Sequence, residues 1–527
     1  MTLNELLKQK KYKEIWQRYC GFADLTLREY MEIQRRLMME QIELMHSCEL
    51  GQRLMQNKKP ASVEDFRRLV PLTTYDDYAD ILLKRNISAL PTEPVMWIET
   101  TWEGGITPVK LIPYSEGMIK VYRTVIIAIV LLATSKKKGS FSLRRFDRFL
   151  HCMASLPYMT GLISYVLDGE IDVTFLPDPK EVEGISFHQR NRMGLYMGMS
   201  GGIDIFCGMG SFVVKASEQF HDISSRILFG SLFQNSFIVN FKLLLALIRK
   251  KFWHQDILPK DILDLKGLIY AGTDAVHLRD HMEKCWGVKP LEVFGGAEPS
   301  CIAADVWSKD GGMVLFPDVC FYEFIPESER ALCDRDPHYV PKTSLMDELV
   351  EGDTYELVFS NFKGGAFLRY RAGYVFQCLS VKNDEDGILF PQFRYVNRVS
   401  AVIDIAGFIR ITEKTIQQAI DLSGLPLGDW VAVKEYNADH KPFLHLYIEM
   451  GEDSLTHMLD AETIRDQLTL YFRYVNLDEQ DLEALLGSDP LVVTMLSHGV
   501  ISGYESAKGC TLRKIDPPAG VISELLC

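Results

Sequence analysis

The spacing of hydrophobic residues predicts a first half of the chain that is mostly helical. In residues 27–45 apolar side chains recur every three or four positions, which is the period of one helix face; they are Tyr30, Ile33, Leu37, Met38 and Ile42. Residues 61–82 predict a helix that ends before Pro71 and a second helix capped by Thr74 or Asp76. Residues 116–260 contain long apolar helical stretches with few turn signals. These segments are expected to form scaffold.

From residue 260 onward the pattern changes to strands that alternate with helices. Residues 265–272 predict a strand, residues 274–287 a helix that ends at Gly287, and residues 290–300 a strand followed by a tight turn. Further strands are expected within 312–327, 354–361 and 365–380. This alternation predicts an α/β domain of layered sheets and helices. Because ligands bind beyond strand ends in such sheets, the loops at 100–110, 294–300 and 369–374 are expected to converge on one site.

The length of the chain and a change of pattern near residue 400 predict two domains. A chain of 527 residues is too long for one compact core. Residues after 400 read as a small α+β unit with helices at 412–423 and 460–474, two strands between them, and a Gly/Pro-rich tail. We therefore expect a large N-terminal domain over residues 1–396 and a small C-terminal domain over residues 397–527, with a hinge at 396–400.

Charge and cysteine content exclude some classes of partner. A net charge of −14 argues against a nucleic-acid partner, since phosphate backbones require clustered Lys and Arg. Eleven scattered cysteines without a CxxC pair are typical of reduced thiols in a cytoplasmic protein. The longest apolar run, 125–133, is far shorter than the roughly 20 residues of a spanning helix, so no membrane partner is expected.

Two glycine-containing segments suggest chemistry but remain ambiguous by themselves. In residues 94–115 a strand ends in a Thr/Gly loop, and a second short strand carries Lys110. Such a loop can present N–H groups and hydroxyls to a phosphate, although no Walker A motif is present and a plain hairpin turn is the alternative. Residues 198–202, "GMSGG", match the form of a nucleophile elbow. The preceding segment is not an apolar strand, so a glycine-rich bend is favoured.

Four segments together resemble the GH3 family of acyl-acid amido synthetases, within the adenylate-forming superfamily, in its bacterial-type form. They are "FRRLVPLTTYDDYADIL", "VFGGAEPSCIA", "VLFPDVCFYEFIPE" and "FLRYRAGYVFQC", the last followed by "FRYVNRVSAVIDIAG". The resemblance covers nearly the whole chain in order and spacing. It implies an α/β fold with a large N-terminal adenylation domain and a small, mobile α+β C-terminal domain.

The resemblance also implies a reaction in two steps. A carboxylic acid attacks the α-phosphate of ATP to give an acyl-adenylate, and an amine, amino acids included, then displaces AMP to form an amide. The implied cofactors are ATP and Mg²⁺. Attack on a phosphate requires its charge to be neutralised by a metal ion and by cationic or N–H donors. The partners are therefore a small carboxylic acid and an amine.

The family motifs assign roles to individual residues. Glu298 corresponds to the carboxylate that binds Mg²⁺, Arg398 to the hinge arginine, and Lys414 to the lysine of the mobile domain that reaches the α-phosphate. The nucleotide is expected to contact the phosphate loop and the glycine turn: Thr100, Thr101, Gly104, Gly105, Lys110, Phe294, Gly295, Gly296, Ala297 and Tyr374. The acid is expected to lie among central helices, against Met197, Met199, Phe206, Met209 and Phe212, whose soft or aromatic side chains suit an apolar substrate. Plain core packing is the alternative for each of these five.

Three departures from the family pattern leave alternative functions open. The phosphate loop reads "TTWEGGITPVK" where the family has Ser, Thr and Gly, and Ala297 replaces a small hydroxyl residue. Tyr374 replaces the Asp that accepts hydrogen bonds from both ribose hydroxyls. Besides an amide synthetase, the sequence therefore allows a catalytically degenerate relative that binds a ligand or partner, and an adenylate-forming ligase that transfers the acyl group to CoA.

Overall fold

The structure of the protein is a computed structural model. It describes residues 1–100, 109–182, 184–218, 242, 257–272, 278–307, 311–336, 338–399, 402–405, 409–425, 427–438, 442–450, 460–475, 491–508, 512–518 and 520–526.

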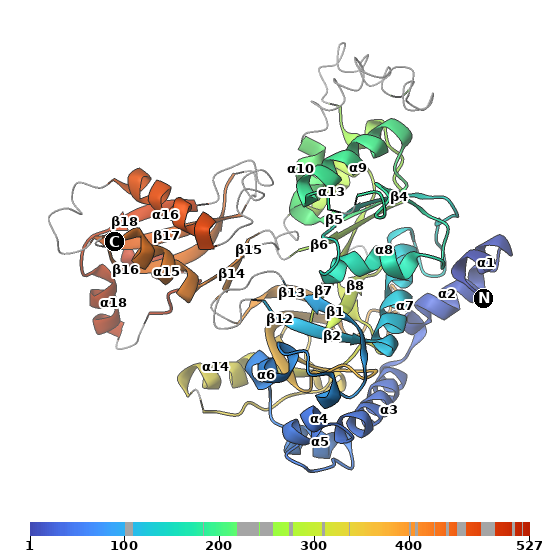
Figure 1. The fold of residues 1–527 in the computed structure, drawn as a ribbon, viewed down its shortest axis with the longest axis horizontal. Helices are drawn as coiled ribbons and strands as arrows, with labels where there is room; N and C mark the ends of the chain where they lie inside the picture. The colour runs from blue at the N-terminus through green and yellow to red at the C-terminus, as the bar shows by residue number, and fades with distance from the viewer. Residues whose placement is uncertain are drawn as a thin grey trace.

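One mixed sheet of eleven strands dominates the described part of the chain (Figure 1). Its order is β10-β11-β12-β13-β9-β8-β7-β6-β5-β3-β4. The strands are β3 (Arg148–Cys152), β4 (Thr174–Leu176), β5 (Ile205–Met209), β6 (Gly267–Ala271), β7 (Pro290–Gly296), β8 (Ser300–Asp305), β9 (Met313–Leu315), β10 (Cys320–Pro326), β11 (Thr354–Asn361), β12 (Tyr370–Ser380) and β13 (Gln392–Arg398). The expected α/β class is confirmed.

Strand β7 joins a parallel half of the sheet to an antiparallel half. Its first residues pair in parallel with β6, and its last residues pair antiparallel with β8. Strands β4, β3, β5, β6 and β7 all run in one direction. Their carboxyl ends therefore share one edge, and the turn that carries Glu298 begins there.

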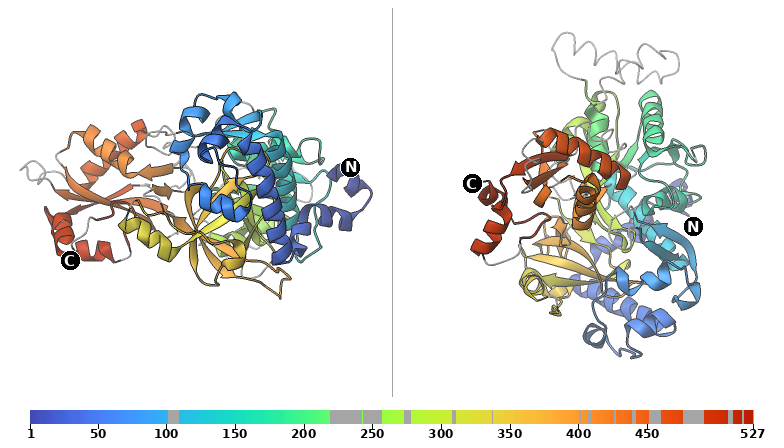
Figure 2. Two further views of the ribbon diagram at one scale, coloured as in Figure 1. Left: turned by 90° about the horizontal axis from the view of Figure 1, so that it is seen from below. Right: turned by 60° about the vertical axis from the view of Figure 1, so that its left-hand side comes forward.

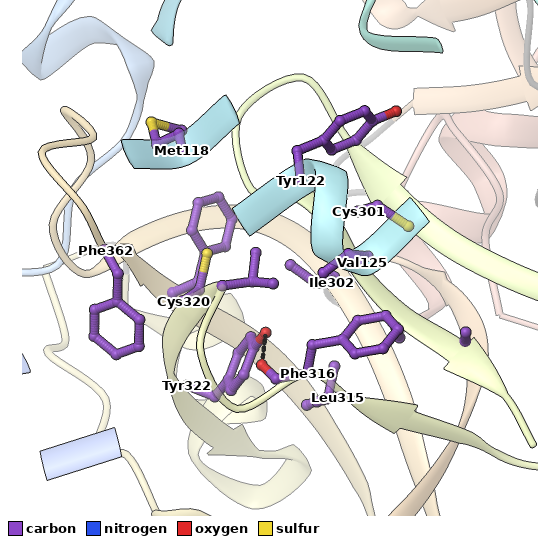
Figure 3. Packing of buried hydrophobic residues seen from close by; sticks show 14 of the residues in the cluster. Met118, Tyr122, Val125, Cys301, Ile302, Leu315, Phe316, Cys320, Tyr322 and Phe362 are labelled. Carbon is purple, nitrogen blue, oxygen red and sulfur yellow. Dashed lines mark hydrogen bonds between the residues drawn. The ribbon is translucent and has the colours of Figure 1, made fainter. Parts of the chain in front are cut away.

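Helices cover this sheet and supply most of the buried apolar surface. They are α1 (Leu3–Lys8), α2 (Tyr12–Cys20), α3 (Leu27–His46), α4 (Glu49–Leu54), α5 (Val63–Leu69), α6 (Ala79–Leu82), α7 (Glu116–Ala133), α8 (Leu162–Leu167), α9 (Phe187–Gly201), α10 (Gly210–Glu218), α13 (Arg279–Trp286) and α14 (Glu327–Arg335). Figure 3 shows α7 packed over the sheet, with Met118, Tyr122 and Val125 above side chains of β8 and β9. Below them the Tyr322 hydroxyl donates to the Phe316 carbonyl at 2.9 Å.

Several local predictions are confirmed. Helix α3 buries Tyr30, Leu37, Met38 and Ile42, and Ile33 packs partly buried against the same core. Helix α5 ends before Pro71, as expected, but the helix expected after Thr74 or Asp76 is a 3-10 turn, Tyr75–Asp77, followed by the short helix α6. Helix α13 ends at Gly287 in the left-handed conformation. The segment at 198–202 closes helix α9 with Gly202 at φ 99°, as a glycine bend does and a nucleophile elbow does not.

The C-terminal residues form sheets and hydrophobic clusters of their own, to one side of the large sheet (Figures 1 and 2). Strands β14 (Val402–Ile405) and β15 (Ile409–Thr412) pair with each other, and β16 (Leu427–Tyr436), β17 (Pro442–Met450) and β18 (Leu491–Leu496) form a second sheet. The helices are α15 (Glu413–Ser423), α16 (Ala461–Val475), α18 (Val500–Lys508) and α19 (Val521–Leu525).

The expectation of a Gly/Pro-rich tail after helix α16 is wrong. Strand β18 pairs in parallel with β17, and buried Leu491 and Val493 join the hydrophobic cluster there. A parallel pair needs a crossover, and α16 supplies it. Helices α18 and α19 then cover the other face through Ile501, Val521 and Leu525.

Two further observations concern redox state and membranes. The nine cysteines within the described ranges are free, and eight of them are buried. Within the same ranges no helix has the length and apolar character needed to cross a bilayer.

Candidate active site

Glu298 is a buried carboxylate held in an ion pair. It follows β7 by two residues and is only 1% exposed. Its Oε1 accepts hydrogen bonds from Lys110 Nζ at 2.9 Å and from the Tyr370 hydroxyl at 3.3 Å. Its backbone carbonyl accepts from Asn361 Nδ2 at 3.0 Å. The side chain and the main chain of this turn are therefore both anchored.

Lys110 reaches Glu298 because a hairpin places it there. Strands β1 (Pro94–Glu99) and β2 (Leu111–Ser115) pair antiparallel, and Glu99 lies opposite Leu111. Beyond that pair the Thr100 N–H donates to the Lys110 carbonyl, and the Lys110 N–H donates to Thr100 Oγ1, both at 3.1 Å. Tyr75 supports the strand from outside by accepting from the Leu111 N–H at 2.8 Å.

The electrostatics favour a charged pair. Burial raises the pKa of Glu298, but the Lys110 ammonium and the nearby Arg398 guanidinium together bring it below its usual value. Burial lowers the pKa of Lys110, yet the Glu298 carboxylate raises it overall. Burial raises the pKa of the Tyr370 hydroxyl well above its usual value. At neutral pH the cluster therefore holds one anion, two cations and a neutral phenol donor.

Tyr374 fills the space beside the glycine turn. A Cβ added to Gly296 would stand 2.7 Å from the Tyr374 hydroxyl oxygen and 3.6 Å from Glu298 Oε2. A Cβ added to Gly295 would stand 2.5 Å from the carbonyl oxygen of Ser300. The backbone leaves no room for a side chain at Gly295, and at Gly296 the Tyr374 hydroxyl occupies space that was expected for the nucleotide.

Tyr374 is itself enclosed, being 4% exposed. It pairs with Arg398 across β12 and β13, and that guanidinium lies 5.1 Å from the center of its ring. Arg398 Nε donates to the Ala372 carbonyl at 3.0 Å, which holds the arginine in place. Phe294 contacts Tyr374 edge-on and stacks on Tyr395, with ring centers 5.0 and 4.9 Å apart.

A cavity of about 220 Å³ opens from Glu298 into the core. It lies at the carboxyl ends of β3, β5, β6 and β7, where an α/β sheet places its ligands. One end is polar, with Glu298 and Thr100. Most of the remaining lining is apolar and is closed by α7; it includes Tyr122, Ile126, Ile129, Cys207 and Cys301, and Glu99 and Thr160 are its further polar members. Tyr122 and Cys301 can be located in Figure 3.

The structure brings together some of the predicted site residues and separates others. Thr100, Phe294, Gly295, Ala297, Glu298 and Met209 line this cavity. Lys110, Tyr374 and Arg398 stand at its polar end, through the contacts above. Met199, Phe206 and Phe212 pack in a neighboring hydrophobic cluster, and Met197 lines a second cavity.

Four predicted residues cannot be placed in the site. Thr101, Gly104 and Gly105 lie outside the described residues. Lys414 belongs to helix α15, but its side chain also lies outside what the structure describes. Their predicted roles stay predictions.

Three tyrosines that the sequence motifs do not single out also shape the site. Tyr370 donates to Glu298, and Tyr75 lies with its ring center 5.7 Å from Lys110 Nζ. The Tyr114 hydroxyl donates to the Ala297 carbonyl at 2.9 Å. Each lies within or next to a quoted motif, yet a tyrosine in a sequence gives no signal that separates a hydrogen-bonding role from packing.

No group of three His, Cys, Asp or Glu side chains within the described ranges is placed to hold a metal ion. A divalent ion at Glu298 would therefore take most of its ligands from elsewhere. This donor set is compatible with Mg²⁺, which is commonly bound by one or two carboxylates together with substrate phosphates and waters.

Comparison with known proteins first defines the class of fold. The chain is similar to 2-hydroxyisobutyryl-CoA ligase in complex with 2-HIB-AMP and CoA, at 14% identity over 91% of this chain and 89% of that one, with a TM-score of 0.58. It is also similar to the AtGH3.15 acyl acid amido synthetase in complex with 2,4-DB, at 13% identity over 96% and 95% of the two chains, with a TM-score of 0.53. No curated protein matches. The fold is that of adenylate-forming ligases.

Two family models then identify the family. The GH3 family N-terminal domain matches residues 21–140, and the GH3 family central domain matches residues 313–398. Residues 21–140 and 313–398 are therefore GH3 family domains, in agreement with the four motifs.

Proposed function

We propose that this chain is an ATP-dependent ligase that adenylates a carboxylic acid and transfers the acyl group to an amine, amino acids included, to form an amide. The observation that carries the proposal is the buried Glu298–Lys110 pair at the polar end of an apolar cavity, on a GH3 scaffold. The family and fold support acid activation and ligation. The choice of amine is supported by the GH3 domains and by the similar amido synthetase.

The cavity suits a small apolar acid. Its apolar wall would take the body of the acid, and its polar end would take the carboxylate. Lys110 and Arg398 supply two cations next to the charge of Glu298, and Glu99, the other carboxylate of the lining, pairs with Arg85 at 3.8 Å. The excess positive charge would hold an anionic carboxylate and would stabilise the negative charge that develops on the phosphorus oxygens during adenylation.

ATP would approach from the same polar end, with Mg²⁺. When bound, Mg²⁺ would neutralise phosphate charge, and Glu298 would be its protein ligand. Lys110 and Tyr370 both donate to Oε1 of Glu298, so Oε2 is the oxygen that would bind Mg²⁺. Lys110 would keep the carboxylate ionised, and Asn361 would keep the turn in place through the Glu298 carbonyl.

The predicted domain boundary between residues 396 and 397 would allow the domain movement that the second step, acyl transfer to the amine, requires. We propose that the C-terminal domain rotates about the segment near Arg398 between adenylation and transfer. Closure of this kind excludes water from a hydrolysable adenylate. It would also bring helix α15, which carries Lys414, to the phosphate during the first step.

Two alternatives are each favoured by one observation. The similar CoA ligase shows that this fold also serves transfer to a thiol in that protein. The buried Tyr374, which lies against Gly296 under Arg398, favours a degenerate nucleotide site instead. For ATP to bind in the expected manner, the Tyr374 ring would have to move away from the glycine turn.

Pyrophosphate exchange tests adenylation directly. Purified protein is incubated with ATP, Mg²⁺, labelled pyrophosphate and a panel of small apolar acids; the proposal predicts acid-dependent label in ATP. Glu298→Gln should abolish this exchange, whereas Glu116→Gln, an exposed carboxylate on α7, should leave it unchanged. Product analysis with an amino acid mixture or with CoA then separates amide from thioester. Absence of exchange with every acid would favour the degenerate alternative.

A further inference from the structure

A second and larger cavity lies on the other side of one wall of the candidate active site. Its volume is about 820 Å³, and it is lined by α8, by β3 and β4, by α9 and by the loop after β4 (Figure 1). The wall is the segment 153–164. Met153, Ala154 and Thr160 line the cavity at Glu298, whereas Ser155, Leu156 and Ser164 line the larger one. Its volume falls within the range of small-molecule sites.

Arg190 is a buried cation for which the described residues offer no ion-pair partner. It lies on α9, lines this cavity and is 8% exposed. One guanidinium nitrogen donates to the Met153 carbonyl, but Nε is buried without a hydrogen-bond partner. No carboxylate among the described residues forms an ion pair with it. Burying an unpaired guanidinium is costly, so this position favours an anion from outside the chain.

His151 provides a second unpartnered atom in the same cavity. It is 8% exposed, and its Nε2 is buried without a hydrogen-bond partner. Burial, with the Arg190 charge nearby, lowers the pKa of His151 to about 3, so the ring is neutral. The nearby Thr160 backbone acts in the opposite direction and favours the protonated ring, but burial outweighs it. A neutral imidazole that donates through one nitrogen accepts through the other, so Nε2 is suited to a hydroxyl or N–H donor.

The other charged side chains of this cavity favour a singly charged anion over a phosphate monoester. Lys180, the other cation of the lining, is exposed and pairs with Asp168 at 3.2 Å. Asp178 and Glu181 add two further carboxylates to the lining. One unpaired guanidinium balances a monoanion, whereas a phosphate monoester carries about −1.5 to −2 charges and would meet these carboxylates. Apolar side chains, Leu156, Ile171 and Leu176 among them, complete the cavity.

We propose that this cavity binds an amphipathic carboxylic acid that carries a hydroxyl or N–H donor near its carboxylate. Arg190 binds the carboxylate, His151 Nε2 accepts from the donor, and the apolar wall takes the tail. The site is separate from the one at Glu298, and it stands whether or not the chain activates acids. Because the two cavities share the wall at 153–164, a ligand here contacts the back of the wall that faces the candidate active site.

Calorimetry on the full chain with three eight-carbon probes tests the proposal. The expected order of affinity is 2-hydroxyoctanoate, then octanoate, then 1-octanol, because only the first has both the charge and the donor. Arg190→Met should weaken 2-hydroxyoctanoate by at least about tenfold, since a charged hydrogen bond is lost. Arg192→Met is the matched control: it removes an exposed arginine two residues away on α9 and should bind as wild type.

A second variant protects the test against misfolding. Met197→Trp fills the cavity without changing its charge, and it should also weaken 2-hydroxyoctanoate. Thermal unfolding confirms that each variant is folded. Wild-type affinity in folded Arg190→Met and in Met197→Trp would overturn the proposal, because the probe would then occupy a different site, such as the Glu298 cavity. Octyl phosphate, titrated as a fourth probe, tests the choice of a monoanion: it should bind more weakly than octanoate, and equal affinity would overturn that choice.

Discussion

Replacement of Lys110 by Met should destabilise the protein strongly and in a pH-dependent way. The variant leaves Glu298 as a buried carboxylate, 1% exposed, without the ammonium that lies 2.9 Å away in the wild type. Removal of one partner from a buried pair typically costs about 3–5 kcal/mol. Because Arg398 still compensates part of the charge, we expect about 3 kcal/mol at pH 8.

The pH dependence follows from the sign of the pKa shift. In the wild type the pKa of Glu298 is lowered, so the pair contributes stability above the pKa of the unfolded chain and loses it as pH falls. Without Lys110, burial raises the pKa of Glu298. The variant therefore loses stability as the pH rises above the pKa that Glu298 has in the unfolded chain. The difference from wild type should therefore be smaller at pH 5 than at pH 8.

Urea unfolding of four proteins at both pH values measures this effect. Glu298→Gln in the Lys110→Met background removes the unpaired charge and should recover most of the loss. Lys120→Met, which breaks an exposed pair with Glu116 on α7, should change stability by no more than about 0.5 kcal/mol. The reasoning is refuted if Lys110→Met alone is no less stable than the double variant at pH 8.

Three further outcomes are expected. Tyr374→Asp should tighten ATP binding by about tenfold or more in calorimetry, because it clears the glycine turn and offers a charged acceptor; unchanged binding would argue against a nucleotide at this turn. Ile126→Trp, which fills the cavity at Glu298, should abolish acid-dependent pyrophosphate exchange but leave ATP binding intact, and exchange at wild-type rate would remove the acid from this cavity. Burial and the Asp305 carboxylate raise the pKa of Glu292 to about 7, so the folded state retains a proton that the unfolded chain loses, and stability falls between about pH 4.5 and 7. Glu292→Gln should remove up to roughly 3 kcal/mol of that decline, and an identical pH profile of the melting temperature in both proteins would contradict it.

Local sequence signals predicted the helices whose buried face or end they mark directly. Helix α3 shows its buried face directly in the spacing of its apolar residues, and the glycine at 287 marks the end of α13. Strand β18 was missed because the chain alternates too briefly there, and because its partner β17 lies more than forty residues away. Pairing over that separation is decided by packing in the tertiary core, about which the local sequence pattern carries little information.

The site was predictable where a motif fixes the backbone, and less so where side chains choose their partners. Glu298 and Lys110 stand in recognisable motifs, and the hairpin brings them together. Tyr374 was noted for the hydroxyl and bulk that it brings, but its position over Gly296 depends on Arg398 and Phe294, which come from other strands. Composition alone could not separate the members of the expected acid wall: Met209 lines the cavity at Glu298, whereas Phe206 lies in the neighboring core. A methionine or aromatic residue gives the same sequence signal in both places.

Calorimetric titration of the purified protein with ATP and Mg²⁺ tests the central claim most directly, with wild type, Glu298→Gln and Tyr374→Asp compared side by side. The account predicts binding to the wild type, loss of binding in Glu298→Gln, and tighter binding in Tyr374→Asp. No binding to the wild type, with binding restored by Tyr374→Asp, would contradict it and would show that the nucleotide site has decayed.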